Sequence, residues 1–240
     1  MTVETRKYFS GDPLTPDELS QEIIREKPGK VIIHNAAPAG LLIVQNFLTS
    51  DQCAQIMQEC KAWKGESGKV LSSGDEGDIV SHEVDSRKVE SISTEGFRIN
   101  IEDLMRKAFT DFVSPHFEQP LAWCEKPVIL RYPEGGEYYP HADAYNWNPD
   151  EKAWRRVTNR DYSLLIYLNE DYEGGQLEFK YLNYRIAPLQ GLLVAFPSDW
   201  RYAHAALPVK RGKKHSIVSF AAAKETPRLD KPLPPNLIKL

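Results

Sequence analysis

The sequence predicts an α+β protein built on a double-stranded β-helix, or jelly roll, with N-terminal helices packed on one of its two sheets. Residues 50–63 and 101–113 place apolar side chains at helical spacing. After Pro120 the chain changes to short apolar segments separated by turn residues. Helices that precede a run of strands are typical of an arrangement in which the helices cover one sheet.

Length and composition limit the class of protein. The 240 residues fit one domain with elaborations, and 41 % hydrophobic and 27 % charged residues are typical of a globular protein. A formal net charge of -4 gives no electrostatic reason to expect nucleic acid as a partner. The chain has no run near the ~20 apolar residues that cross a bilayer, so no membrane partner is expected.

The first half of the chain predicts an arm, a strand and a helix. Residues 1–40 are polar and interrupted by prolines, and we expect an N-terminal arm there. Residues 41–47 are apolar and predict a strand. Ser50 is placed to cap the following helix, with Asp51 in its first turn. Residues 64–90 are rich in Gly, Ser and charge, which predicts a long loop or a flexible hairpin.

The second half predicts the sheets. Five apolar segments are expected as strands, at residues 127–132, 162–168, 175–182, 191–196 and 215–220. The main domain is therefore expected over residues 41–225, with its core at 127–221. The Pro-rich tail at 226–240 is expected to run over the surface. The three cysteines match no zinc spacing, and no apolar run follows the first methionine, so we expect reduced cysteines in a cytoplasmic protein.

Three residues of this core could hold a metal ion. His141 and Asp143 are two residues apart in a segment expected to be extended, so their side chains point to the same side. His204 could supply a third ligand from a separate segment. Two histidines and one carboxylate on one face of an octahedral ion are typical of non-haem Fe(II) oxygenases. A His-x-Asp triplet also arises by chance, and a single histidine is often structural, so spacing alone leaves both interpretations open.

Lys214 adds to the metal interpretation. It follows His204 by ten residues, after an expected hairpin turn at 210–213 and at the start of the last strand. A lysine there could pair with the distal carboxylate of a dicarboxylate bound at the metal. The alternative is a solvated charge in a basic run, and Lys213 is an adjacent competitor that would face the other side of the strand.

Several segments together resemble a known family. They are RYPEGGEYYPHAD, RDYSLLIYLNEDYEGGQLEF, GLLVAFPSD and HAALPVKRGKKHSIVSF, with FLTSDQCAQIM upstream. In content, order and spacing, residues 127–221 resemble the catalytic domain of the prolyl 4-hydroxylase family of Fe(II)- and 2-oxoglutarate-dependent oxygenases. The resemblance implies an enzyme, a dioxygenase that uses Fe(II), 2-oxoglutarate and O2, with ascorbate as an accessory reductant.

The resemblance also implies roles for single residues. His141, Asp143 and His204 match the iron ligands, and Lys214 matches the basic residue that holds the C5 carboxylate of 2-oxoglutarate. Tyr167 matches a position that donates a hydroxyl to the same carboxylate in some members, and Tyr132 matches a tyrosine that lines the co-substrate pocket. Core packing with a satisfied hydroxyl is the alternative for both tyrosines. Because the carboxylate of Asp143 is present, hydroxylation or another oxidation is implied, and halogenation is not.

The substrate is less defined. Residues 64–90 and 144–160 are candidate lids, and Trp147, Arg160 and Arg201 are candidate substrate contacts; plain surface positions are the alternative. The resemblance favours hydroxylation of a prolyl or other amino-acid residue in a peptide or protein, with release of succinate and CO2. A free amino acid or another small molecule, such as a natural-product intermediate, is the alternative substrate.

Two other classes of function compete with an oxygenase. One is a zinc- or manganese-dependent, cupin-like isomerase or hydrolase, which leaves Lys214 unexplained. The other is a non-enzymatic, cupin-like binding or sensor module, which would be favoured by a missing ligand residue, and no ligand residue is missing. The sequence gives no signal of the oligomeric state.

Overall fold

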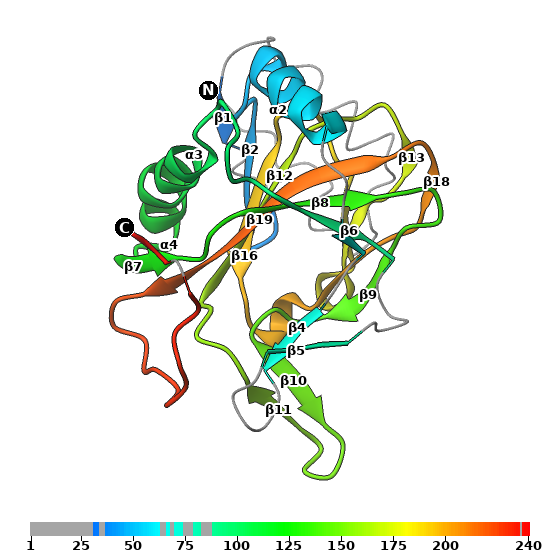
Figure 1. Cartoon of the computed structure of the whole chain (residues 1–240). Helices are drawn as coiled ribbons and strands as arrows, with labels where there is room; N and C mark the ends of the chain where they lie inside the picture. Colours follow the sequence, from blue (N-terminus) through cyan, green and yellow to red (C-terminus); the bar gives the residue numbers. More distant parts are fainter. Residues whose placement is uncertain are drawn as a thin grey trace, which may run out of the picture.

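The computed structural model of the chain is described here for residues 31–33, 37–62, 66–67, 70–73, 79–82, 88–235 and 237–240. Most of the expected N-terminal arm at 1–40 and parts of the segment 64–90 therefore lie outside the described residues. The described part forms two facing sheets with helices on the outer side of the larger one (Figure 1). No helix among the described residues is long and apolar enough to cross a membrane.

The larger sheet contains ten strands in the described part of the chain, mostly antiparallel neighbours from distant parts of the sequence. In order they are β1 (Ile32–Ile33), β2 (Leu42–Gln45), β16 (Leu193–Pro197), β12 (Tyr162–Tyr167), β19 (Lys214–Ala223), β8 (Val128–Tyr132), β6 (Glu90–Ser93) and β3 (Glu66–Ser67). The other two are β7 (Leu121–Cys124), which pairs with the end of β19, and β20 (Ile238–Lys239), which pairs with β7.

The smaller sheet faces the larger one and carries part of the candidate site. Its order is β15 (Tyr184–Ile186), β14 (Leu177–Phe179), β17 (His204–Ala206) and β9 (Tyr138–His141). Three two-stranded pairs complete the described strands: β10 (Tyr145–Asn148) with β11 (Ala153–Arg156), β13 (Glu173–Gly174) with β18 (Val209–Arg211), and β4 (Val70–Ser73) with β5 (Ile79–His82). Short 3-10 turns lie at η2 (Lys180–Leu182) and η3 (Trp200–Tyr202).

The helices cover the outer face of the larger sheet. They are α2 (Ser50–Ala62), α3 (Ile101–Ala108), a π-helical turn η1 (Phe109–Val113) and α4 (Ser114–Phe117). The Asn100 side chain caps α3 by accepting a hydrogen bond from the backbone N–H of Asp103 at 3.2 Å. Apolar side chains from α2, α3 and η1 form one buried cluster with side chains of the larger sheet.

Alternation along the strands divides the interior into two layers. On β12, Leu164 and Ile166 belong to the cluster under the helices, whereas Tyr167 belongs to the cluster between the two sheets. Phe179 of β14 and Phe196 of β16 meet edge to face inside this second cluster, with ring centroids 4.9 Å apart. The predicted α+β jelly roll is thereby confirmed.

The structure also sharpens several expectations. All five predicted segments contain a strand, and the strand at 215–220 extends to Ala223. The segment 64–90 contains β3 and the β4–β5 hairpin, while 144–160 forms the β10–β11 hairpin that projects at the bottom of Figure 1. The tail does more than run over the surface, because β20 joins the larger sheet and Ile238 is buried.

Candidate metal and co-substrate site

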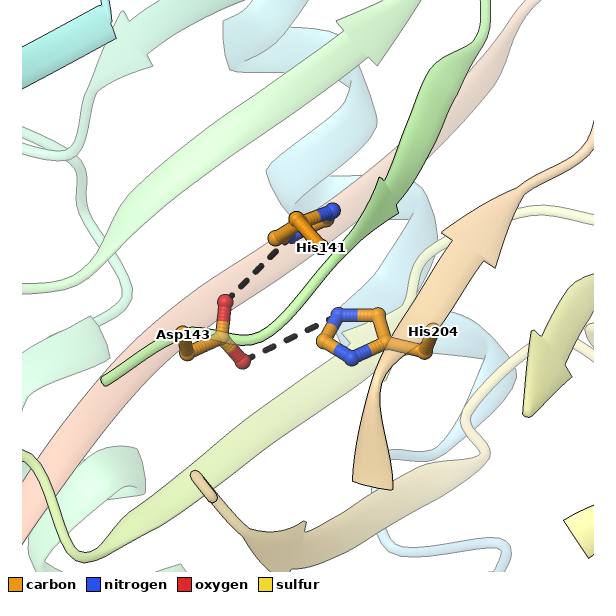
Figure 2. Close-up of side chains that lie close together, drawn as sticks. All are labelled: His141, Asp143 and His204. Carbon is orange, nitrogen blue, oxygen red and sulfur yellow. Dashed lines mark ion pairs between the residues drawn. The ribbon is translucent and has the colours of Figure 1, made fainter. Parts of the chain in front are cut away.

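The three predicted ligand residues converge between the two sheets (Figure 2). His141 ends β9 and His204 begins β17, and the pairing of these strands places the two residues opposite each other. Asp143 follows β9 by two residues. Its Oδ1 lies 3.4 Å from Nε2 of His141, and its Oδ2 lies 3.7 Å from Nε2 of His204. One potential ligand atom from each residue lies within 4.8 Å of the others, so one ion could contact all three.

Backbone carbonyls orient both imidazoles. Nδ1 of His141 is 2.8 Å from the carbonyl oxygen of Tyr139, and Nδ1 of His204 is 3.0 Å from that of Tyr202. A proton on each Nδ1 leaves the Nε2 lone pairs, which face Asp143, free for a metal ion. Tyr138 stacks on the His141 ring at 3.7 Å between centroids and fixes its plane.

The Asp143 carboxylate is held in its charged form. Ser163 donates a hydrogen bond to Oδ2 at 2.6 Å, and the Ser163 hydroxyl is 2.7 Å from that of Ser198. Burial would raise the pKa of Asp143, but the His204 and His141 imidazoles and the Ser163 hydroxyl together lower it below its usual range. Burial lowers the pKa of His204 to about 4, which keeps this imidazole neutral.

This set of donors fits a divalent iron ion. Two imidazole nitrogens and one carboxylate oxygen on a single face leave the remaining octahedral positions for other ligands. Among the described residues, no second cluster of His, Cys, Asp and Glu side chains is arranged to hold a metal ion. Zinc would also accept these donors, so the neighbouring lysine becomes the deciding feature.

Lys214 is also buried in the interior of the protein, and no carboxylate of the described residues lies beside its charge. It begins β19 opposite Tyr132 of β8 and is only 2 % exposed. Its Nζ lies 4.2 Å from the centre of the Tyr132 ring and donates to the carbonyl oxygen of Gly175 at 2.9 Å. No carboxylate among the described residues forms an ion pair with it, and burial lowers its pKa to about 7. Lys213, the competing lysine, is exposed.

Close to Lys214, several hydroxyl oxygens of the described residues are buried and have no hydrogen-bond partner. Within the described residues, the hydroxyls of Tyr167, Tyr172 and Ser216 are buried and accept or donate no hydrogen bond. Ser216 lies opposite Tyr167 in the β12–β19 ladder, two residues from Lys214. The Tyr172 ring lies against Gly175, where an added Cβ would approach both this ring and the Lys214 side chain. A buried cation beside unpaired hydroxyls fits the distal carboxylate of a 2-oxo dicarboxylate.

Comparison with known proteins agrees with this geometry. Residues 127–222 match the family model of the 2OG-Fe(II) oxygenase superfamily. This segment includes His141, Asp143, His204 and Lys214, and it resembles the oxygenases of that superfamily. Mouse prolyl 3-hydroxylase 3 is 28 % identical over 204 residues, which cover 73 % of the chain. The chain spans 28 % of the length of that relative. The resemblance to prolyl hydroxylases seen in the sequence is confirmed.

Solved structures support the jelly-roll fold of this chain. A collagen prolyl hydroxylase of Paramecium bursaria Chlorella virus-1, in complex with 2-oxoglutarate, aligns with a TM-score of 0.56 at 22 % identity. The alignment covers 76 % of the chain and 96 % of the viral protein. A Trichoplax adhaerens prolyl hydroxylase, in complex with a hypoxia inducible factor peptide, gives a TM-score of 0.59 at 21 % identity, over 78 % of the chain and 84 % of that protein.

The three candidate substrate residues lie in different surroundings. Arg160 donates to both carboxylate oxygens of Glu125, at 2.6 and 2.7 Å, and its guanidinium lies 3.7 Å from the centre of the Phe220 ring. Trp147 is 51 % exposed on the β10–β11 hairpin, where it meets Trp154 edge to face. Of the three, Arg160 is the one whose charge interacts with that of a metal ligand, Asp143.

Arg201 is the third candidate and the least suited to the site. It lies in η3, and its guanidinium donates to both carboxylate oxygens of Asp199, at 3.0 and 2.6 Å. Its side chain remains 64 % exposed. A substrate carboxylate would have to compete with Asp199 for this arginine.

Sequence reasoning missed the residues that support the site. Ser163 was detectable, because it is a polar residue on the inward side of an apolar strand, in phase with Leu165 and Tyr167. Ser198 and Tyr172 lie in turns, and no periodicity predicts which way a turn residue points. The supporting contacts arise from strand pairing between distant segments, which a single sequence does not reveal.

Proposed function

We propose that this protein is an Fe(II)- and 2-oxoglutarate-dependent dioxygenase that hydroxylates an unactivated C–H bond of a prolyl, or another amino-acid, residue in a peptide or protein. The observation that carries the proposal is the combination of the His141–Asp143–His204 triad with the buried Lys214, whose ammonium donates to a carbonyl oxygen and forms no ion pair with a carboxylate of the described residues. A zinc hydrolase needs the triad but has no use for the lysine. A binding module has no need of an orientated triad.

Separate residues would bind the iron and the co-substrate. Iron, 2-oxoglutarate and O2 supply the oxidation, in which one oxygen atom enters the substrate C–H and the other enters succinate as CO2 leaves. His141, Asp143 and His204 would hold the iron on one face. Lys214, with the Tyr167 hydroxyl, would hold the distal carboxylate and so orient the co-substrate, while Tyr132 packs under the ammonium.

A peptidyl substrate is supported by the relatives. The relatives named above are prolyl hydroxylases, and one is in complex with a peptide. The three cysteines are buried and free, as suits the cytoplasmic location we propose.

An anaerobic titration tests the cofactor part of the proposal. Adding Fe(II) and then 2-oxoglutarate should give a weak charge-transfer band near ~500 nm, because the 2-oxo acid chelates an open facial site. His141→Ala is the control and should give no band. Iron that binds to the wild-type protein without producing the band would exclude 2-oxoglutarate chelation and leave the zinc and binding-module interpretations.

The substrate part needs a separate experiment. The iron-loaded protein is incubated with 2-oxoglutarate, O2, ascorbate and either proline-containing peptides or free amino acids. Mass spectrometry then follows the gain of one oxygen atom, and succinate is measured in parallel. Hydroxylation of peptides but not of free proline supports the proposal. Hydroxylation of a free amino acid alone would establish the small-molecule alternative, and fragmentation of the product identifies the carbon.

A further inference from the structure

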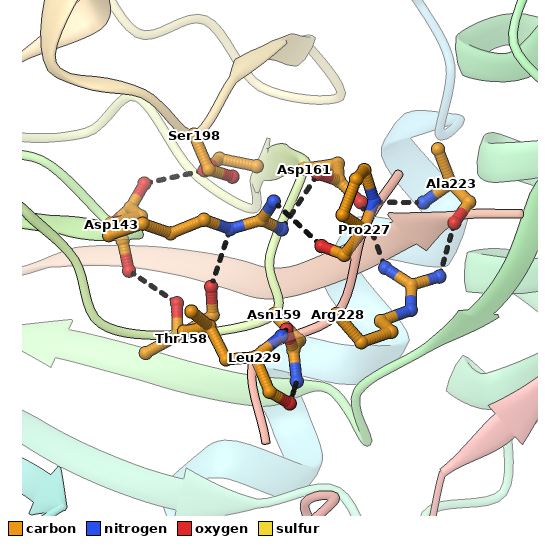
Figure 3. A network of polar contacts seen from close by, with 11 residues as sticks. Asp143, Thr158, Asn159, Asp161, Ser198, Ala223, Pro227, Arg228 and Leu229 are labelled. Atoms are coloured by element: carbon orange, nitrogen blue, oxygen red, sulfur yellow. Dashed lines mark hydrogen bonds and ion pairs between the residues drawn. The ribbon is translucent and has the colours of Figure 1, made fainter. Parts of the chain in front are cut away.

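The C-terminal segment at 227–229 is bound to the chain that follows the metal ligand Asp143 (Figure 3). The backbone N–H of Leu229 donates to Oδ1 of Asn159 at 2.8 Å, and Nδ2 of Asn159 donates to the carbonyl oxygen of Leu229 at 3.4 Å. The carbonyl oxygen of Pro227 accepts from Nη1 of Arg156 at 3.4 Å. The pairing of β20 with β7 holds the last residues of the tail, so the segment is fixed on both sides.

Asp161 is the centre of this contact. Its Oδ1 accepts from Nη2 of Arg156 at 2.9 Å, and its Oδ2 lies 3.2 Å from Nη1 of Arg228 and accepts from the backbone N–H of Ala223 at 2.8 Å. The Arg228 guanidinium also donates to the carbonyl oxygen of Ala223. The Asp161 side chain is only 13 % exposed, so these donors take the place of water around its carboxylate.

Two routes join Asp161 to the metal ligand. The carbonyl oxygen of Asp161 accepts from the backbone N–H of Ser198 at 2.9 Å, and the Ser198 hydroxyl contacts Ser163, which donates to the Asp143 carboxylate. On the other route, Nε of Arg156 donates to the carbonyl oxygen of Thr158 at 3.0 Å. The Thr158 hydroxyl donates to the carbonyl oxygen of Asp143 at 3.3 Å.

The same contacts hold the base of the β10–β11 hairpin. Arg156 ends β11 opposite Tyr145, which begins β10 only two residues after Asp143. The backbone N–H of Val157 donates to the carbonyl oxygen of Ala144 at 2.8 Å. A movement of the hairpin base would therefore pull directly on the residue next to the metal ligand.

We propose that Arg228 is a positioning residue for the metal centre. Through Asp161 and Arg156 it holds the tail, the base of the β10–β11 hairpin and the backbone of Asp143 in one arrangement. The inference rests on the proposed function, because it assigns the triad to a metal. It predicts that loss of the Arg228 guanidinium loosens the hairpin and weakens the metal site, although Arg228 bonds to Asp161 and Ala223 and not to a ligand side chain.

The test compares Arg228→Ala with Lys231→Ala, which removes the same charge from an exposed position of the same tail. Hydrogen exchange of the 144–158 region is measured in the ligand-free full chain, and Fe(II) affinity is measured anaerobically. For Arg228→Ala we expect about tenfold faster exchange there. We also expect Fe(II) affinity about 3- to 10-fold weaker, less than the ~10–100-fold typical of residues that touch a ligand. Arg228→Lys should recover part of both, and Lys231→Ala should change neither.

The outcomes separate this inference from the proposed function. If Arg228→Ala lowers the unfolding temperature but leaves both the exchange of the 144–158 region and the Fe(II) affinity at wild-type values, Arg228 is a structural residue only and the inference is wrong. If the wild-type protein gives no charge-transfer band, the proposed function fails, yet the exchange measurement still decides whether Arg228 holds the hairpin. Should Arg228→Ala not fold, Arg228→Gln carries the same measurements.

Discussion

The two ends of the site differ in how completely the fold satisfies their polar groups. At the metal end, His141 and His204 each use Nδ1 on a backbone carbonyl, and the Asp143 carboxylate accepts from Ser163. These hydrogen bonds orient the three side chains.

At the lysine end, the hydroxyls of Tyr167, Tyr172 and Ser216 are buried without partners in the described part of the chain. Within the described residues, the contacts of the Lys214 charge are a carbonyl oxygen and the faces of two tyrosine rings. An unmade hydrogen bond of a buried group costs about 1–3 kcal/mol. The lysine end therefore leaves buried polar groups for a ligand to satisfy, whereas the side chains of the metal end are already orientated by hydrogen bonds within the fold.

This difference indicates how the site binds its components. An ion enters a metal end that is already orientated, so little conformational entropy is lost. A dicarboxylate at the lysine end would supply the missing partners and the missing countercharge, so it should stabilise the folded state strongly. The predictions below test this difference, from the largest expected effect to the smallest.

Asp143→Ala should remove the function of the metal end while leaving the lysine end intact. Without the carboxylate, two imidazoles remain, and 2-oxoglutarate-dependent formation of succinate should fall by at least about 10³-fold. The measurement is succinate release at saturating Fe(II). Asp111→Ala, a change at an exposed carboxylate on η1, is the control and should behave as wild type. Wild-type succinate release by Asp143→Ala would show that the metal lies elsewhere.

Lys214→Met should disable the lysine end alone. Losing the partner of a buried carboxylate should raise the 2-oxoglutarate requirement by about 10²- to 10³-fold, equivalent to about 3–4 kcal/mol. Lys213→Met, at the adjacent exposed residue, is the matched control. A 2-oxo acid without a distal carboxylate, 2-oxobutyrate, should bind both variants alike. Equal weakening of the two acids by Lys214→Met would mean that the lysine does not recognise the distal group.

Much of this site could be predicted from the sequence, because successive side chains of an extended segment point to alternate sides. His141 and Asp143 share one side of an extended segment, and Lys214 and Lys213 point to opposite sides at the start of a strand. The helices were also predictable, since a 3.6-residue period is visible in any amphipathic segment.

The remaining features depend on contacts between distant segments. Arg228 meets Asp161 across 67 residues, and β20 pairs with a strand more than a hundred residues earlier. Neither contact leaves a periodic signal. Strand β17 has three residues and is too short to show a period. The β10–β11 hairpin is too hydrophilic to show one. Local patterns thus identified the ligands, whereas tertiary pairing decides what holds them.

Ser163→Ala tests whether hydrogen bonds within the fold orient the ligands of the metal end. The variant removes the 2.6 Å hydrogen bond to Asp143 and leaves the ligands themselves unchanged. Fe(II) affinity should fall by about 10- to 100-fold, as is usual for residues that orient a ligand. At saturating Fe(II), 2-oxoglutarate affinity should stay at its wild-type value. Ser219→Ala, which removes another buried hydroxyl with its own hydrogen bond, is the control. A change in 2-oxoglutarate affinity alone would contradict the division into two ends.

The affinity for 2-oxoglutarate should depend on pH through Lys214. Burial lowers the pKa of this lysine to about 7, and a bound dicarboxylate raises it again, so binding takes up a proton. Affinity should be constant below pH 7 and fall by about tenfold per unit above it. Tyr167 and Tyr172, whose pKa values burial raises, stay neutral in this range, as does His204 with its pKa of about 4.

The ligand-free protein should show the opposite trend. The folded state lowers the pKa of Lys214 from 10.5, so the unfolded chain binds the extra proton between pH 7 and 10.5, and the contribution of Lys214 to stability rises over that interval. Chemical unfolding of wild type and Lys214→Met at several pH values isolates this contribution. Parallel profiles for the two proteins, in stability and in 2-oxoglutarate affinity, would contradict the assignment.

Tyr172→Phe gives the smallest and most specific test of the lysine end. The change removes one unpaired hydroxyl and keeps the ring that packs against Gly175. If this hydroxyl donates to the distal carboxylate, 2-oxoglutarate affinity should fall by about 3- to 10-fold, and 2-oxobutyrate affinity should not change. The ligand-free protein should become more stable, because a buried group without a partner is gone. Tyr181→Phe, at an exposed ring, is the control. A more stable protein with unchanged affinity for both acids would restrict the lysine end to Lys214, Tyr167 and Ser216, because the Tyr172 hydroxyl would then lie beyond the reach of the ligand.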